Sequence, residues 1–225
     1  MFSPPWQQQL KTRFFTLWLA KAVGTTLGIT LFFLCYFWVM HHPLGAVYTM
    51  PLTWADRAVA FWPETFAAYV SLWVYVTFGP ALARDRRELA ACGLAMLFMS
   101  VVGFALFLVL PTQVPTAAVD WSQHSAMQFL KQVDATGNAC PSLHVAFAVF
   151  TALLLDYQFR AIGCPAALRW INLLWCLAIM HSTLATRQHV AWDVLAGAVL
   201  AVAAGALHHR LAGWGSRRPL RAVAA

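Results

Sequence analysis

Six apolar segments, each close to the length that crosses a membrane as a helix, dominate this sequence. They run over residues 18–40, 65–82, 89–110, 142–158, 168–186 and 189–208. A helix needs about 20 apolar residues to cross the hydrocarbon core of a bilayer. Only helices and closed barrels satisfy the backbone hydrogen bonds there. The pattern therefore predicts an all-α fold, a polytopic membrane six-helix bundle that forms one domain over residues 1–225.

The composition supports lipid as the solvent for much of the chain. Hydrophobic residues make up 61% of the sequence and charged residues 10%, whereas soluble domains carry about 25% charged residues. The net charge is +7, which is compatible with either nucleic acid or a membrane surface as a partner. The charges form short clusters between the apolar segments, so we expect a membrane and no nucleic acid.

The distribution of the basic residues predicts an orientation. Alternate loops carry Lys11, Arg13, Lys21, Arg84, Arg86, Arg87, Arg160, Arg169, Arg210, Arg217, Arg218 and Arg221. The remaining loops carry only Arg57, Lys131 and Arg187. Because cytoplasmic loops are enriched in Lys and Arg, both termini are expected in the cytoplasm. Residues 41–64, 111–141 and 182–189 are then expected to face outward.

The start of the sixth segment carries an ionisable pair. His189 and Asp193 are four residues apart, a spacing that places two side chains on one face of a helix. The carboxylate can fix the tautomer of the imidazole and leave the other ring nitrogen as a nucleophile or base. Gly197, Ala201 and Gly205 continue this face, and small residues at this spacing let another helix approach closely. A His–Asp pair that only holds the bundle together is the alternative.

The start of the fourth segment carries a second polar group. Ser142 and His144 are expected in the first turn of a helix, where backbone N–H groups and the helix dipole attract anions. His144 is then a candidate to protonate a leaving oxygen. Ser142 alone is more often a helix cap than a ligand.

Together, Pro141-Ser142-Leu143-His144 and His189-x-x-x-Asp193 resemble two motifs of the type 2 phosphatidic acid phosphatase superfamily. Its members are six-span membrane enzymes or soluble acid phosphatases. The resemblance implies that His189 forms a phospho-histidine, that Asp193 orients it, and that His144 is the general acid. It also implies a lipid phosphate as substrate and no cofactor.

The chain departs from the usual motifs where the family holds the phosphate. Leu143 replaces a Gly, Thr183 replaces an Arg, and Arg187 lies two residues before the histidine instead. The family's first motif is not evident. These changes resemble the branch that contains inositol phosphorylceramide synthases and related bacterial proteins, which implies a bacterial inner membrane with the site on the periplasmic side. We take Ser142, Leu143 and Arg187 as the candidate phosphate-binding residues.

Other chemistries fit the sequence less well. Cys140 lacks an Arg six residues later, since position 146 is Ala, and no Gly-x-Ser-x-Gly elbow is present. A metal site can be drawn from His144, His189 and Asp193 with His124 or His41. Metal-ion phosphatases usually gather more carboxylates, and the chain has 8 Asp and Glu in total, so we expect no metal.

A transporter is the non-enzymatic alternative, because a His–Asp pair can also line a transport pathway. The polar residues are expected at one membrane face rather than in broken mid-membrane helices, which favours an enzyme. Water as the acceptor gives a phosphatase, and a lipid or sugar hydroxyl gives a phosphotransferase. The sequence leaves this choice, the identity of the lipid and the oligomeric state open.

Overall fold

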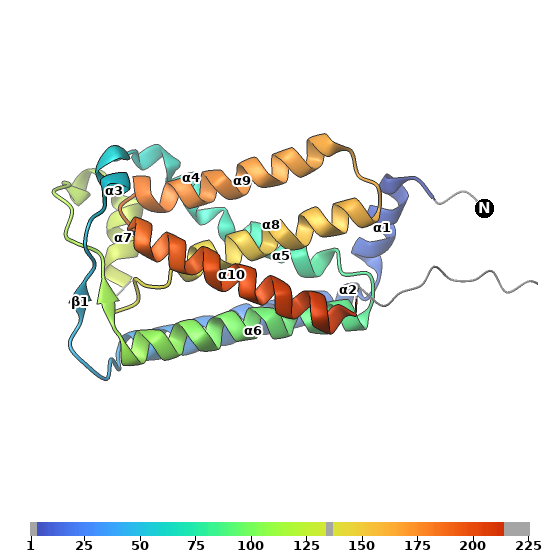
Figure 1. The fold of residues 1–225 in the computed structure, drawn as a ribbon, viewed down its shortest axis with the longest axis horizontal. Coiled ribbons are helices and arrows are strands. Elements are labelled where there is room, and N and C mark those ends of the chain that lie inside the picture. Colours follow the sequence, from blue (N-terminus) through green and yellow to red (C-terminus); the bar gives the residue numbers. More distant parts are fainter. Residues whose placement is uncertain (1–3, 134–136, 214–225) are drawn as a thin grey trace, which may run out of the picture.

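A computed structural model describes residues 4–133 and 137–213, and these are mostly helical (Figure 1). The helices are α1 (Trp6–Phe15), α2 (Trp18–Met40), α3 (Trp54–Ala58), α4 (Phe66–Val70), α5 (Leu72–Ala81), α6 (Arg86–Val109), α7 (Ser125–Val133), α8 (Leu143–Ala161), α9 (Ala166–Ala185) and α10 (Ala191–Ala212). Short 3-10 helices cover Pro63–Thr65 and Trp121–Gln123. Two short strands, β1 (Tyr48–Thr49) and β2 (Thr112–Gln113), pair in parallel.

The predicted helical fold class is confirmed, and each apolar segment contains helix. By length and apolar composition, three helices within the described ranges qualify as membrane spans, namely α2, α6 and α10. The second segment is divided into α4 and α5 at Ser71. The α8 helix is long enough but carries His144, Asp156, Gln158 and Arg160. The number of six spans therefore stays a prediction.

The α8 helix lies at the centre of the core. It packs against α5, α9 and α10, while α10 also packs on α6. The predicted close approach along α10 is confirmed at Gly197, where an added Cβ would lie 2.3 Å from the carbonyl oxygen of Ser142. Ala201 is fully buried on the same face. Small residues therefore bring the first turns of α8 and α10 together.

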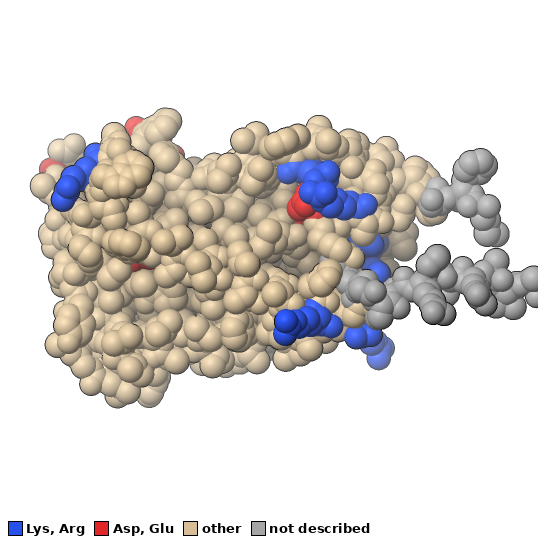
Figure 2. Space-filling model, viewed as in Figure 1, with Lys and Arg blue, Asp and Glu red and all other residues tan. Residues whose placement is uncertain are grey.

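The two ends of the bundle differ in charge. The N-terminal helix α1 and the end of α10 lie at one end, where most of the visible Lys and Arg side chains gather (Figures 1 and 2). The starts of α8 and α10, together with α3, α7 and the strands, lie at the other end (Figure 1). Arg217, Arg218, Arg221 and the side chain of Lys131 lie outside the described residues. The charge asymmetry predicted from the loops is thus a feature of the fold.

The buried charged groups Glu88 and Lys21 at the basic end have polar partners. Glu88, which is 1% exposed, accepts a hydrogen bond from Gln158 Nε2 at 3.0 Å and forms an ion pair with Arg84 at 3.5 Å. Lys21 Nζ donates to the carbonyl oxygens of Arg13 at 2.5 Å and of Ala81 at 2.9 Å. These bonds tie α1, α2, α5, α6 and α8 into one polar layer.

The contact at Gly197 predicts a stability effect. Gly197→Ala places a methyl group against the Ser142 carbonyl, so α8 and α10 must separate, and we expect a loss of about 1–3 kcal/mol. Gly205→Ala is the matched control, because its Cβ would meet Leu153 Cδ1 at an ordinary 3.6 Å. Thermal unfolding of the purified proteins in detergent measures both. Equal unfolding midpoints for the two variants would contradict the close contact.

Candidate active site

The first turns of α8 and α10 are joined by backbone contacts at the end of the bundle opposite α1 (Figure 1). The N–H of Ser142 donates to the carbonyl oxygen of Asp193 at 3.0 Å. The Ser142 hydroxyl accepts from the N–H of Val145 at 3.2 Å and so caps α8. Ser142 is fully buried and is not among the residues that line the cavity described below. The structure therefore shows Ser142 in the capping role.

His189 and Asp193 lie together as the spacing predicts, although the local structure differs. The ring Nδ1 of His189 lies 3.5 Å from Asp193 Oδ2. The α10 helix begins at Ala191, so the prediction of a shared helix face is wrong for His189, which precedes the helix. Asp193 instead folds back over the helix start, where its Oδ2 accepts the N–H of Val190 at 3.0 Å. The side chain of Asp193 is fully buried, whereas that of His189 is 12% exposed.

A tight turn fixes the position of His189. The N–H groups of Gln188 and His189 both donate to the carbonyl oxygen of Thr183, each at 3.0 Å. Arg187, within this turn, has a φ of 57°, a left-handed conformation that is uncommon for residues other than glycine. The turn therefore directs the imidazole away from the course that a continuous helix would give it.

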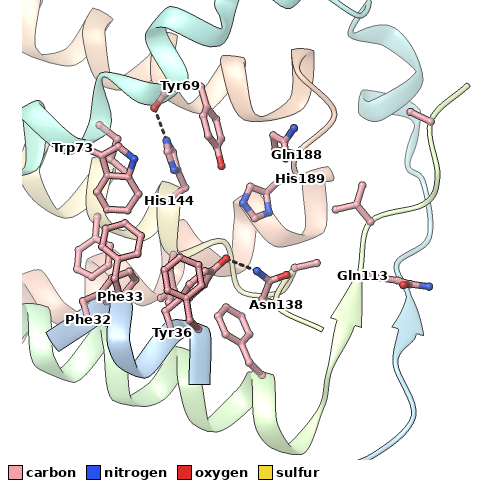
Figure 3. Close-up of a pocket in the computed structure, with 18 of the residues that line it drawn as sticks. Phe32, Phe33, Tyr36, Tyr69, Trp73, Gln113, Asn138, His144, Gln188 and His189 are labelled. Atoms are coloured by element: carbon pink, nitrogen blue, oxygen red, sulfur yellow. Dashed lines mark hydrogen bonds between the residues drawn. The ribbon is translucent and has the colours of Figure 1, made fainter. Parts of the chain in front are cut away.

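His144 is held by Tyr69 and Trp73. Its ring stacks on Tyr69 with centroids 3.9 Å apart, and Trp73 meets it edge-on at 6.1 Å. Its Nε2 lies 2.8 Å from the carbonyl oxygen of Tyr69 (Figure 3). Because a carbonyl oxygen only accepts, Nε2 must carry a proton. Nδ1 is then the ring nitrogen that can take up or deliver a second proton.

Both histidines line one cavity of about 370 Å³, which we call the headgroup cavity (Figure 3). Leu143 lines it as well, with its side chain packed against Gly103 of α6, so that its N–H is the group it can offer to an anion. The other side chains are mostly aromatic or amide groups, including Phe32, Tyr36, Tyr69, Trp73, Gln113, Asn138 and Gln188. The described residues that line it include no Lys or Arg.

Several of these residues were not predicted. Gln188 and Asn138 belong to the two polar stretches that the sequence marks, so their positions were an available signal. The sequence around Tyr36 gave no such signal, because α2 reaches the cavity only through tertiary packing. The hydroxyl of Tyr36 accepts a hydrogen bond from Asn138 Nδ2, more than a hundred residues away (Figure 3).

Arg187 points to the backbone of α3 rather than to the headgroup cavity. Its Nη1 donates to the carbonyl oxygen of Asp56 at 3.0 Å and its Nη2 to that of Val59 at 2.8 Å. Asp56 in turn accepts the N–H of Ala191 at 2.7 Å. Arg187 is not among the residues that line the cavity. In this structure the guanidinium fastens α3 to the start of α10, and its assignment to phosphate binding stays a prediction.

No group of three or more His, Cys, Asp and Glu residues within the described ranges is placed to hold a metal ion. His124, drawn above as a possible ligand, instead packs against Phe61 with ring centroids 5.4 Å apart. Metal-free chemistry stays a prediction.

The helical bundle thus holds a His–Asp pair and a second histidine, and both histidines line one cavity. The sequence profile of the PAP2 superfamily matches residues 36–207, and the chain belongs to that superfamily. Comparisons with curated proteins and with solved structures find no match. The matched range contains His144, His189 and Asp193. Membership supports a phosphatase-type function, either phosphatase or phosphotransferase.

The contacts of Arg187 predict how its substitution behaves. Arg187→Lys keeps the charge but cannot reach two carbonyl oxygens with a planar fork. We expect a lower unfolding temperature and an unchanged inhibition constant for orthovanadate. Arg57→Lys, an exposed cation on α3, is the control. A weaker affinity for vanadate at an unchanged unfolding temperature would instead assign Arg187 to phosphate binding.

Proposed function

We propose that this protein is a membrane lipid phosphate phosphatase that works through a phospho-histidine at the outer face of the membrane. The observation that carries the proposal is the convergence of His189, backed by Asp193, and of His144 on one cavity, in a chain that belongs to the PAP2 superfamily.

In the first step, Nε2 of His189 attacks phosphorus while the ester oxygen leaves with a proton from His144. The P–O bond breaks as the N–P bond forms, so the products are an alcohol and phospho-His189. Asp193 holds the proton on Nδ1 of His189 and stabilises the charge on the ring. The 3.5 Å separation must shorten for this bond, as is common when a substrate binds.

In the second step, water attacks the phosphorus of phospho-His189. His144 lost its Nδ1 proton in the first step, so Nδ1 now accepts the proton from that water. Inorganic phosphate then leaves. The enzyme returns to its starting protonation state. The carbonyl of Tyr69 holds His144 through Nε2 in both steps, so that Nδ1 exchanges the proton.

The start of α8 supplies donors for the phosphate oxygens. The first backbone N–H groups of a helix have no partner within it. In α8 the N–H of Val145 goes to the Ser142 hydroxyl and that of Ala146 to the Ser142 carbonyl. The N–H groups of Leu143 and His144 remain for a ligand, and the helix dipole favours an anion there.

We further propose six spans in a bacterial inner membrane, with both termini in the cytoplasm. The gathering of Lys and Arg at the end that carries α1 supports this orientation (Figure 2). In this proposed orientation the headgroup cavity lies at the periplasmic side of the membrane.

A lipid phosphotransferase is the second candidate. The amide nitrogen of Gln113 donates to Thr49 at 2.9 Å and that of Gln188 to the carbonyl of Thr186 at 3.4 Å. Their amide oxygens are acceptors that suit the hydroxyls of a sugar or lipid acceptor. The resemblance to the inositol phosphorylceramide synthase branch points the same way. A transporter is disfavoured, since the candidate site lies at one end of the bundle.

His189→Ala is the test of the nucleophile. No other group can take over the covalent step, so we expect turnover to fall by about 10⁴-fold or more. Purified protein is assayed against phosphatidic acid, phosphatidylglycerol phosphate and polyprenyl phosphates, with phosphate release and lipid products both followed. His181→Ala, an exposed histidine on α9, is the control. A well-folded His189→Ala variant with near-normal turnover would exclude the mechanism.

His144→Ala is the test of the acid. General acid catalysis contributes about 10²- to 10⁴-fold, and the loss should be large for alkyl esters and small for a nitrophenyl ester. With the nitrophenyl ester, ³²P-labelled phospho-enzyme should accumulate, because hydrolysis of the phospho-enzyme then lacks His144 as its general base. Equal losses on both esters would remove His144 from proton transfer.

A further inference from the structure

A second cavity of about 380 Å³ lies between α2, α5 and α6. It shares Phe32, Leu72, Trp73 and Phe147 with the headgroup cavity, so the two cavities adjoin at these side chains, which we call the aromatic junction. From Phe32 it follows α2 as far as Ala20. At 1.5 Å per residue this is a run of about 18 Å. We call this cavity the chain groove.

Glycines create the chain groove. Gly24 and Gly28 lie on one face of α2, and Gly93 lies on α6. A Cβ added at any of the three would meet no atom within 4 Å. Gly103 and Gly197, by contrast, are in direct contact with a neighbouring helix. The glycines of the chain groove therefore leave space between helices instead of closing it.

The chain groove is lined mainly by apolar side chains along its whole length. Its walls carry side chains such as Ile29, Val76, Met96 and Phe104, and the Ser100 hydroxyl is satisfied by the carbonyl of Met96 at 3.0 Å. Ala20 at the far end adjoins Lys21, whose ammonium group bonds to the carbonyls of Arg13 and Ala81. A ligand with a polar head near His189 and an apolar tail matches this order of surfaces.

We propose that the chain groove binds the hydrocarbon chain of the lipid phosphate substrate. This rests on the function proposed above. The phosphate lies at His189, and the chain passes Trp73 and Phe147 toward Gly24. Lipid tails are as apolar as the groove, so transfer from the bilayer contributes little affinity. What the groove supplies is orientation, because a chain fixed along α2 restricts the approach of the phosphate to Nε2.

Gly28→Leu and Gly93→Leu fill the chain groove from opposite walls, and the open space at both positions lets the variants fold. For long-chain phosphatidic acid we expect kcat/KM to fall by about tenfold or more, as misplacement of a reacting group commonly costs. Turnover of water-soluble nitrophenyl phosphate should stay at the wild-type value. Ala22→Leu, an exposed small-to-large change on the same helix, is the matched control. Equal losses on both substrates, or no loss on either, would overturn the proposal.

A binding measurement separates this proposal from the proposed function. The His189→Ala protein is photolabelled in mixed micelles with phosphatidic acid that carries a diazirine at the end of one chain. We expect label on peptides from residues 20–32 and 89–104, reduced by Gly28→Leu and by competing phosphatidic acid. Competition by phosphatidylcholine of equal strength would show a structural lipid site and overturn the proposal. Label in the chain groove without wild-type turnover of any lipid phosphate would reject the proposed function alone.

Discussion

The contact between α8 and α10 at Gly197 is the constraint on which the candidate site depends. The Ser142 carbonyl occupies the space that a Cβ would need, and the Ser142 N–H reaches the carbonyl of Asp193. Two helix starts can meet this closely only because one of them carries no side chain at the crossing. The first turn of α8 and the loop before α10 then line the same cavity, so the proposed acid and the proposed nucleophile lie beside one space.

Capping interactions hold this junction rigid. Asp193 is fully buried, and an isolated buried carboxylate is costly. The N–H of Val190, the positive end of the α10 dipole and the imidazole of His189 offset that cost. Asp56 accepts another N–H at the same helix start, and Arg187 anchors Asp56 through its carbonyl. The loop before α10 is therefore positioned by polar groups of α3 and of the helix start itself.

The sequence carried enough information to predict the helices and to select His144, His189 and Asp193 as candidates that the structure brings near one another. Apolar length and polar residues at segment ends are local signals. The sequence could not show that His189 lies outside its helix, since the turn at Arg187 depends on a left-handed φ and on bonds to α3. It could not place Tyr36 or Trp73 at the headgroup cavity, because their packing is between distant segments. Phosphate binding was expected of Arg187 because it lies close in sequence to His189. In the structure the guanidinium N–H groups of Arg187 donate to the carbonyl oxygens of Asp56 and Val59.

If the headgroup cavity binds a phosphate as proposed, the described residues that line it balance its charge with groups other than Lys and Arg. Among the described lining residues, the groups able to carry positive charge are His144 and His189. The bond from His144 to the Tyr69 carbonyl keeps Nε2 protonated, so a second proton at Nδ1 makes this ring a cation beside the N–H groups of Leu143 and His144. On the proposed mechanism, proton donation to the leaving oxygen removes that cation while attack on phosphorus gives the ring of His189 a positive charge, which the carboxylate of Asp193 stabilises. The proposed chemistry thus couples charge balance to proton transfer, and in the proposed binding mode the aromatic junction shared with the chain groove places the hydrocarbon beside the same imidazole.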